Sequence, residues 1–432
     1  MEGKAAKPKI KLTGKQWGIV ITAVLMYFFA PTFGAVSTTY QLMPDVFGVA
    51  PAEASWIGSI SNACSCIAGL LVGLFVGKNV SYRVGCIFAT AMFTVFGALP
   101  FLWQDITWPM LLASRVLFGL GIGMFNPIVQ AILTRMIVEE GPRAAAIGFI
   151  NIAFAIGGIF GSMIVGALAT TSWQNGYAFY LFCVIPLILS IIFIHDKDIV
   201  NAMENEKPGE VLDQAKVEQA EKAAEGGVTE RRHIPAAAWA FIIIFCLSTL
   251  CSQCFFNYIG LAMVFSGADP LLIGTVFSVF TVASILIALV NAPLWKGLRL
   301  WNFPLCFVLM AIGYVCCLGG FFTGGVALFF AAAAVIGFGC CLGGMVIPMA
   351  MSTICSAASL TLAIAIQEIA RNLGGFLSTP WMMAIGGSFG DVPDVQFTAV
   401  IVLCVIGAVI AGVLAARFNK RFKNVEMQMP PM

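Results

Sequence analysis

The sequence contains very little charge. Of its 432 residues, 23 are Lys or Arg and 21 are Asp or Glu, which together make up 10% of the chain. Soluble domains carry roughly 25% charged residues, so this composition excludes an ordinary soluble protein. The formal net charge of +2 is too small to favour a nucleic-acid partner. With 60% hydrophobic residues and a mean hydropathy of +0.96, we expect an integral protein of a lipid bilayer.

Histidine is nearly absent, and no phosphate loop or nucleophile triad is visible. His195 and His233 both fall in one central polar segment, which excludes a histidine relay inside the membrane. The 14 cysteines lie almost wholly in apolar runs and are expected to be small buried side chains. Cys251-x-x-Cys254 has no second pair and no histidine nearby, which disfavours a metal site. The sequence therefore predicts no enzyme activity, no metal and no cofactor.

Long apolar runs recur along the whole chain. By their length they predict about twelve membrane spans, and hence an all-α membrane protein. The predicted spans are Trp17–Tyr40, Trp56–Val76, Val84–Leu102, Pro109–Val138, Ala144–Thr170, Tyr177–Ile194, Ala236–Ser266, Leu271–Leu294, Trp301–Phe322, Gly325–Ser352, Leu360–Gly387 and Val395–Ala416.

A polar segment rich in Glu, Lys, Ala and Gln divides the spans into two sets of six. It predicts a domain at 1–194, a solvated linker at 195–235 with a short helix near Val211–Ala224, and a second domain at 236–432 that ends in a basic tail. Lys and Arg gather in the linker, at both termini and in the loops of the same side, whereas the opposite loops contain acidic residues only. The positive-inside rule thus predicts that both termini are cytoplasmic.

The stretch from Thr361 to Pro380 is long and apolar, yet it contains Glu368 and Arg371. Arg371 would lie ~15 Å into a hydrocarbon core of ~30 Å. A charge at that depth is costly unless it faces protein or water, and is by default functional. On a helical wheel both residues share an arc of roughly 140° with Gln367 and Asn372. We expect this face to line a substrate cavity.

The pair suggests a mechanism, because a guanidinium matches the fork of a carboxylate. Arg371 would bind an anionic substrate, and the competition would leave Glu368 to take up a proton. Asp45 and Glu53, near the ends of spans, are weaker candidates for proton coupling. The alternative is a structural ion pair that never meets substrate.

Further polar residues are placed within or beside the predicted spans. Two pairs share a helical face by their spacing, and either line the cavity or join neighbouring helices. These candidates are Asn126 with Gln130, Gln253 with Asn257, and Gln41.

The two halves of the sequence resemble each other. Gly157-Gly158-x-x-Gly161-Ser162 in the fifth span corresponds to Gly374-Gly375-x-x-Ser378-Thr379 in the eleventh. Repeated halves are typical of secondary transporters, whose substrate site lies where the halves meet.

Nearly the whole chain resembles the major facilitator superfamily. Arg115-Val-Leu-Phe-Gly119-Leu-Gly121-Ile-Gly123 is similar to its fourth-helix motif, and Gly157 and Gly161 to the glycine motif of its fifth helix, although Ser162 replaces the usual proline. The resemblance implies two six-helix bundles that rock around a central cavity. We expect Arg115 to brace its helix against a neighbour, with coupling as the alternative.

Together these observations predict a monomeric carrier of the plasma or inner membrane. Its solute would be a small organic anion, with protons as the candidate coupling ion. One alternative is a drug or metabolite effluxer driven by proton antiport. Another is a membrane sensor or scaffold, which would need no charge at mid-membrane.

Overall fold

A computed structural model describes residues 14–31, 35–76, 80–136, 140–195, 234–355 and 357–421. Most of the predicted linker, including its expected short helix, and the end of the basic tail lie outside the described residues. Each of the predicted spans coincides with one or more described helices. Among the described residues, nine helices are long and apolar enough to cross a membrane, and the shorter Gly14–Phe29 and Leu271–Ile287 are also apolar.

Apolar runs become helices here because a helix satisfies its own backbone hydrogen bonds in lipid. The elements of the first half are α1 Gly14–Phe29, the 3₁₀ helix η1 Val36–Leu42, α3 Met43–Phe47, α4 Pro51–Ala54, α5 Trp56–Phe75, α6 Tyr82–Leu102, α7 Trp108–Met136, α8 Glu140–Ala169, the 3₁₀ helix η2 Trp173–Cys183 and α9 Val184–Phe193. Those of the second half are α12 Ala236–Phe265, α13 Leu271–Leu298, η3 Arg299–Trp301, α14 Asn302–Thr323, α15 Val326–Ile354, α16 Ala357–Phe389 and α17 Pro393–Arg421.

The first span is not one continuous helix. Where the sequence predicted a single span over Trp17–Tyr40, α1 ends at Phe29 and η1 begins at Val36. Pro31 lies just beyond the end of α1. A proline lacks the N–H that would continue the helical ladder and disfavours helical geometry in the residue before it. The break places η1 beside α12 of the second half.

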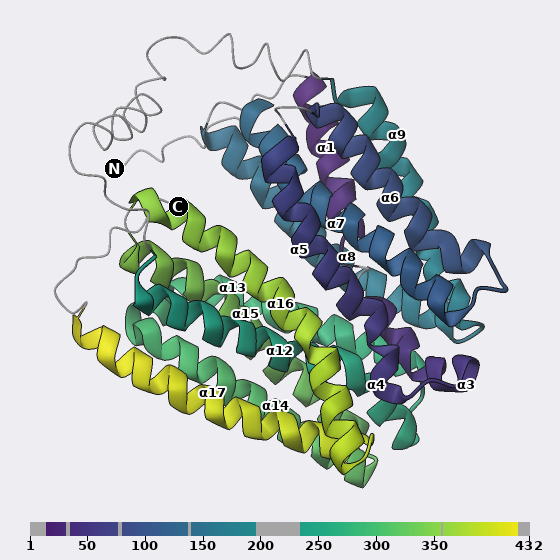
Figure 1. Ribbon diagram of the computed structural model, residues 1–432, viewed down its shortest axis with the longest axis vertical. Coiled ribbons are helices and arrows are strands. Elements are labelled where there is room, and N and C mark those ends of the chain that lie inside the picture. The colour runs from purple at the N-terminus through teal and green to yellow at the C-terminus, as the bar shows by residue number, and fades with distance from the viewer. Residues whose placement is uncertain are drawn as a thin grey trace, which may run out of the picture.

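Buried apolar side chains form two clusters in the first half and one large cluster in the second, which also takes in Ala52. In the first half α5 and α6 both lie along α7, and α1 lies along α8. In the second half α14 lies between α15 and α17, and α12 lies along α16. Figure 1 shows the helices of the two halves on opposite sides, with α4 at the end where the halves come together.

Two antiparallel helix pairs join the halves, α5 with α16 and α8 with α13. In the second pair, an added Cβ at Gly166 would lie 3.2 Å from the Cα of Gly274, so the two backbones almost touch. One turn further along α13, the hydroxyl of Ser278 donates to the carbonyl of Ile159 at 2.9 Å. These contacts lie in the part of each helix nearer to α4, which we call the α4 end of the molecule.

Candidate functional site

Glu368 and Arg371 form an ion pair on α16. The guanidinium Nη2 and Nε of Arg371 lie 2.8 and 2.9 Å from Glu368 Oε2, so two donors of the arginine bind the same carboxylate oxygen. Their spacing of three residues puts both side chains on one face of the helix. The amide of Asn372 donates to the Glu368 carbonyl at 3.1 Å. Both charged side chains remain 50% exposed, so the pair is accessible.

The face that carries this pair points towards the first half of the protein. Further along α16, the Ser59 hydroxyl of α5 donates to the carbonyl of Gly375 at 3.4 Å and lies 2.5 Å from the hydroxyl of Thr379. Arg371 and Glu368 precede Gly375 by four and seven residues, which returns each to the same helical face. The ion pair therefore lies on the side facing α5, beyond the last of these contacts.

The other sides of α16 have different surroundings. Leu373 and Leu377 are exposed and project from the face opposite Gly375. Gly374 is buried so tightly against the Cys246 carbonyl of α12 that an added Cβ would overlap it. The exposed leucines suit contact with lipid, so the exposed charges and the exposed apolar side chains are segregated on opposite faces.

The antiparallel packing of α5 on α16 brings one further amide close to this site. Asn62 of α5 lies against Gly375, where an added Cβ would be 2.7 Å from its Nδ2. Because the helices run in opposite directions, the residues after Asn62 lie towards Arg371. The sequence did not single out Asn62, because the pairing of the two helices cannot be read from either span alone.

Three predicted residues lie inside the second half rather than beside the ion pair. Asn257 of α12 is buried and donates to the hydroxyl of Ser378 at 3.2 Å. Gln367 is also buried, and Gln253 is half-buried. Within the described part of the chain, Asn257 Oδ1 and Gln367 Oε1 have no hydrogen-bond partner. Of the three, the Asn257 amide joins α12 to α16.

Asn126 and Gln130 meet on a tyrosine that the sequence patterns did not single out. Tyr27 of α1 donates its hydroxyl proton to Asn126 Oδ1, and Gln130 Nε2 donates to the Tyr27 oxygen at 3.3 Å. This cluster joins α1 to α7 within the first half, and the Gln130 side chain is exposed. Tyrosine carries both an apolar ring and a hydroxyl. Within an apolar run it is therefore counted as part of the span, and its hydroxyl is not noticed.

Gln41 of η1 lies against α12. An added Cβ at Gly260 would be 2.8 Å from Gln41 Oε1, so the absence of a side chain there makes room for the amide. This oxygen is buried, and no partner for it occurs among the residues that the structure describes. Gln41 thus belongs to the contact between the halves.

Arg115 of α7 is enclosed, with 1% of its surface exposed. Its guanidinium donates to the carbonyls of Phe96, by a short contact, and of Gly97, at 3.4 Å, on α6. The carbonyl of Phe96 would normally accept from the residue four positions on, but that residue is Pro100, which has no N–H. Arg115 supplies the missing donor and lies 4.8 Å from the ring centre of Phe118. It therefore joins α7 to α6.

The glycines of both predicted motifs lie in helix contacts. An added Cβ at Gly119 would be 2.6 Å from the Ser61 carbonyl oxygen, and one at Gly121 2.8 Å from the Phe93 nitrogen. Gly123 lies as tightly against Ser65, and Gly157 against the Phe28 carbonyl. Gly161 is buried on α8. Small residues at such positions let membrane helices approach closely.

The α4 end holds one of the acidic residues of the loops opposite the basic ones. Asp391, between α16 and α17, accepts a hydrogen bond from the backbone N–H of Ala52 at 2.9 Å and another from the hydroxyl of Tyr258. Ala52 is 339 positions away in the chain. No sequence pattern links residues so far apart, so only the fold reveals the contact.

Comparison with known proteins settles the family. The sequence profile of the Major Facilitator Superfamily matches residues 18–294, which is more than half of the chain. The chain belongs to the Major Facilitator Superfamily. No curated protein sequence matches it.

Solved superfamily structures share the fold over almost their whole length. A bacterial homolog of the human lysosomal transporter Spinster, inward-facing and unoccupied, has a TM-score of 0.70 at 12% identity, with 95% of this chain and 99% of that one covered. A point mutant of the nucleoside transporter NupG has a TM-score of 0.72 at 13% identity, covering 95% and 100%. The peptide transporter POT in complex with sulfate has a TM-score of 0.72 at 14% identity, covering 94% of each chain.

As a superfamily member, the chain is a multi-pass membrane protein and a secondary transporter of small solutes. The predicted family and all-α fold are confirmed, and a transporter rather than a catalytic enzyme is indicated. In the described residues, no group of three or more His, Cys, Asp or Glu side chains is arranged to hold a metal ion.

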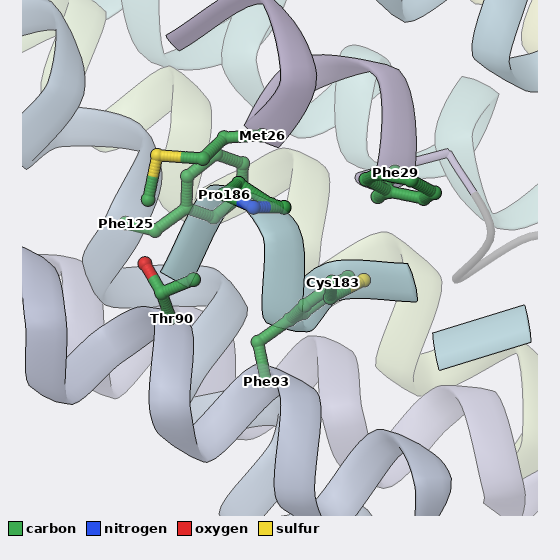
Figure 2. A pocket seen from close by; sticks show the side chains of 7 residues that line it. All are labelled: Met26, Phe29, Thr90, Phe93, Phe125, Cys183 and Pro186. Carbon is green, nitrogen blue, oxygen red and sulfur yellow. The ribbon is translucent and has the colours of Figure 1, made fainter. Parts of the chain in front are cut away.

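One small cavity lies inside the first half of this superfamily member. It is lined by Met26, Phe29, Thr90, Phe93, Phe125, Cys183 and Pro186, as Figure 2 shows. Its free volume is about 10 Å³, room for about one water molecule. The hydroxyl of Thr90 already donates to the carbonyl of Cys86. A solute does not fit there. The exposed face of α16 is the candidate site because it carries the half-exposed ion pair of Glu368 and Arg371.

Proposed function

We propose that this transporter carries a small organic anion whose carboxylate binds Arg371. One observation supports this more than any other: a half-exposed guanidinium lies on the α16 face that points towards the other half. Charged side chains within spans are costly and are found where they face substrate or ion pathways. The fork of donors on arginine matches the two oxygens of a carboxylate. Beside Glu368, two of these donors share the single oxygen Oε2.

Glu368 would couple this anion to a proton. In the empty carrier its charge is balanced by Arg371. An incoming carboxylate competes for the same donors, and Glu368, without its cationic partner, binds a proton. Proton and anion then cross together while the site stays neutral. The amides of Asn372 and Asn62, which lie beside the pair on α16 and α5, would contact the remainder of the solute.

The proposed setting is the plasma or inner membrane, with both termini cytoplasmic. The orientation follows from the distribution of Lys and Arg between the two sets of loops. In this orientation the α4 end faces outwards, and the ion pair lies on its inward side.

Uptake by proteoliposomes tests the proposal. A panel of labelled carboxylates is compared with cationic dyes, with and without a pH gradient. We expect carboxylate uptake that the gradient drives uphill. Glu368→Gln should abolish pH-driven accumulation but retain exchange, and Arg371→Lys should lower uptake about tenfold because the fork is lost.

Two control variants accompany this test. Asp105→Asn removes a carboxylate from an exposed turn between α6 and α7, and Leu373→Ala shortens an exposed side chain on the opposite face of α16. Both should transport like the parent. Dye transport without carboxylate transport would instead establish the effluxer, and an unchanged pH dependence in Glu368→Gln would refute coupling at this residue.

A further inference from the structure

Asp391 is held by three partners at the α4 end. Its Oδ2 accepts from the backbone of Ala52 in α4, in the first half of the chain. Its Oδ1 accepts from Tyr258 of α12 and, at 3.3 Å, from the amide of Gln396 on α17. One carboxylate therefore joins the first half to two helices of the second.

The surroundings are shaped to fit this contact. An added Cβ at Gly386 would lie 3.1 Å from the Asp391 carboxyl group, so a larger residue there would push the carboxylate away. Ala52 is only 2% exposed, although α4 belongs to the first half, because it is packed into the apolar core of the second. Figure 1 shows α4 at this meeting point.

A row of hydroxyls continues the contact towards the ion pair. Ser55 Oγ and Ser59 Oγ each lie 2.5 Å from Thr379 Oγ1, so two residues of the first half share one hydroxyl of the second. These hydrogen bonds accompany the apolar packing of Ala52. Water can replace each of them when the halves separate, which keeps their net contribution to stability small and the closure reversible.

We propose that Asp391 is the latch that holds the α4 end shut, and that releasing Ala52 from it starts the opening of the transporter on that side. This inference goes beyond the transported solute and does not depend on anion binding at Arg371. Tyr258 and Gln396 act as positioning residues, because they hold the carboxylate in place for Ala52.

A buried thiol behind the latch can report on its opening. Ser55→Cys is nearly isosteric and places a thiol at a residue that is 1% exposed, next to Thr379 of the other half. The full chain in lipid nanodiscs is treated with a membrane-impermeant maleimide, and labelling by the parent with its 14 cysteines is subtracted as background.

We expect Asp391→Ala to speed labelling of this thiol about tenfold, since hydrogen bonds to a charged acceptor are lost. Tyr258→Phe keeps the ring and loses one donor, so a smaller increase is expected. Asp394→Asn, three positions away, is the matched control and should label like the parent. Elution as a single monodisperse species shows that each variant remains folded.

Two outcomes would overturn the latch. In the first, Asp391→Ala and Tyr258→Phe both label at the parent rate, which would mean that the contact does not hold the halves together. In the second, Asp394→Asn accelerates labelling as much as Asp391→Ala, which would show a general effect of removing charge at this end.

Discussion

Arg115 and Arg371 are both arginines of membrane-spanning helices, yet their surroundings have little in common. Arg115 is enclosed by two backbone carbonyls, a serine hydroxyl and the rings of Phe118 and Tyr177. Arg371 lies half-exposed beside one carboxylate. An arginine whose donors are used up by fixed backbone joins helices, whereas one balanced by a single side chain can exchange that partner for another anion. The partners, rather than the residue type, separate the two roles.

The largest effect is expected when Arg115 is replaced, and it is measured as a change in the free energy of unfolding. Arg115→Met leaves the Phe96 carbonyl without a donor and should lower the free energy of unfolding by about 2–3 kcal/mol. Unfolding in mixed micelles with a denaturing detergent measures the loss. In a Pro100→Ala background the helix again provides an N–H to Phe96, so Arg115→Met should cost less there. Equal losses in both backgrounds would contradict the role assigned to Arg115.

A second test concerns glycines on the same two helices. Gly119→Ala on α7 brings a methyl group 2.6 Å from the Ser61 carbonyl oxygen and should destabilise by about 1–3 kcal/mol. Gly387→Ala on α16 meets nothing within 4 Å among the described residues, so no loss is expected, and a gain of up to about 1 kcal/mol. The same unfolding assay compares them. If Gly387→Ala lowered the free energy of unfolding as much as Gly119→Ala, close packing at Gly119 would be ruled out as the cause of its loss of stability.

The third test removes the other arginine. Arg371→Ala should change the free energy of unfolding by less than about 1 kcal/mol, because an exposed ion pair contributes little. Carboxylate uptake in proteoliposomes should nevertheless disappear. If instead the variant were as unstable as Arg115→Met, Arg371 would be a structural residue like its counterpart.

The smallest expected effect is the pH dependence of the latch. Burial raises the pKa of Asp391, and the charge of Glu53 on α4 adds to this, although hydrogen bonds from Ala52 and Gln396 oppose it. Among the described residues, Tyr258 of α12 also contacts this carboxylate, and Asp394 of α17 follows it by three positions. On opening, water would restore the ordinary pKa, so the closed state binds the proton more tightly.

Acid should therefore favour the closed α4 end, and this advantage should disappear as the pH rises through the raised pKa. Labelling of Ser55→Cys should slow as the pH falls. Rates are normalised to those of the Asp391→Asn background, which corrects for titration of the thiol itself. A ratio that stays constant with pH would show that Asp391 does not titrate between the two states.

The sequence predicted the fold more completely than the site. Apolar length was sufficient for the spans, since lipid forces long apolar runs into helices. The i, i+3 spacing predicted the pairing of Glu368 with Arg371, which depends on one helix alone. Pro31 carried a visible signal for the break after α1 that run length overlooked. Domain boundaries and site roles remain predictions.

Contacts between distant segments could not be predicted in this way. The donation from Arg115 to a carbonyl exposed by Pro100 requires knowing how α6 lies on α7. Asn62 and Asp391 depend in the same way on which helices of the two halves are neighbours. Asn257 shares a helix face with Gln253 as predicted, but is buried against α16 because that face packs on its own half.

The near-contact of Gly166 with Gly274 has a mechanical consequence. Interlocked side chains would have to change rotamers before one helix could turn on another. Two glycine backbones that face each other have no side chains to interlock. At this point the crossing of α8 and α13 can therefore tilt without changing rotamers, whereas one turn further on the hydrogen bond from Ser278 to Ile159 must break first.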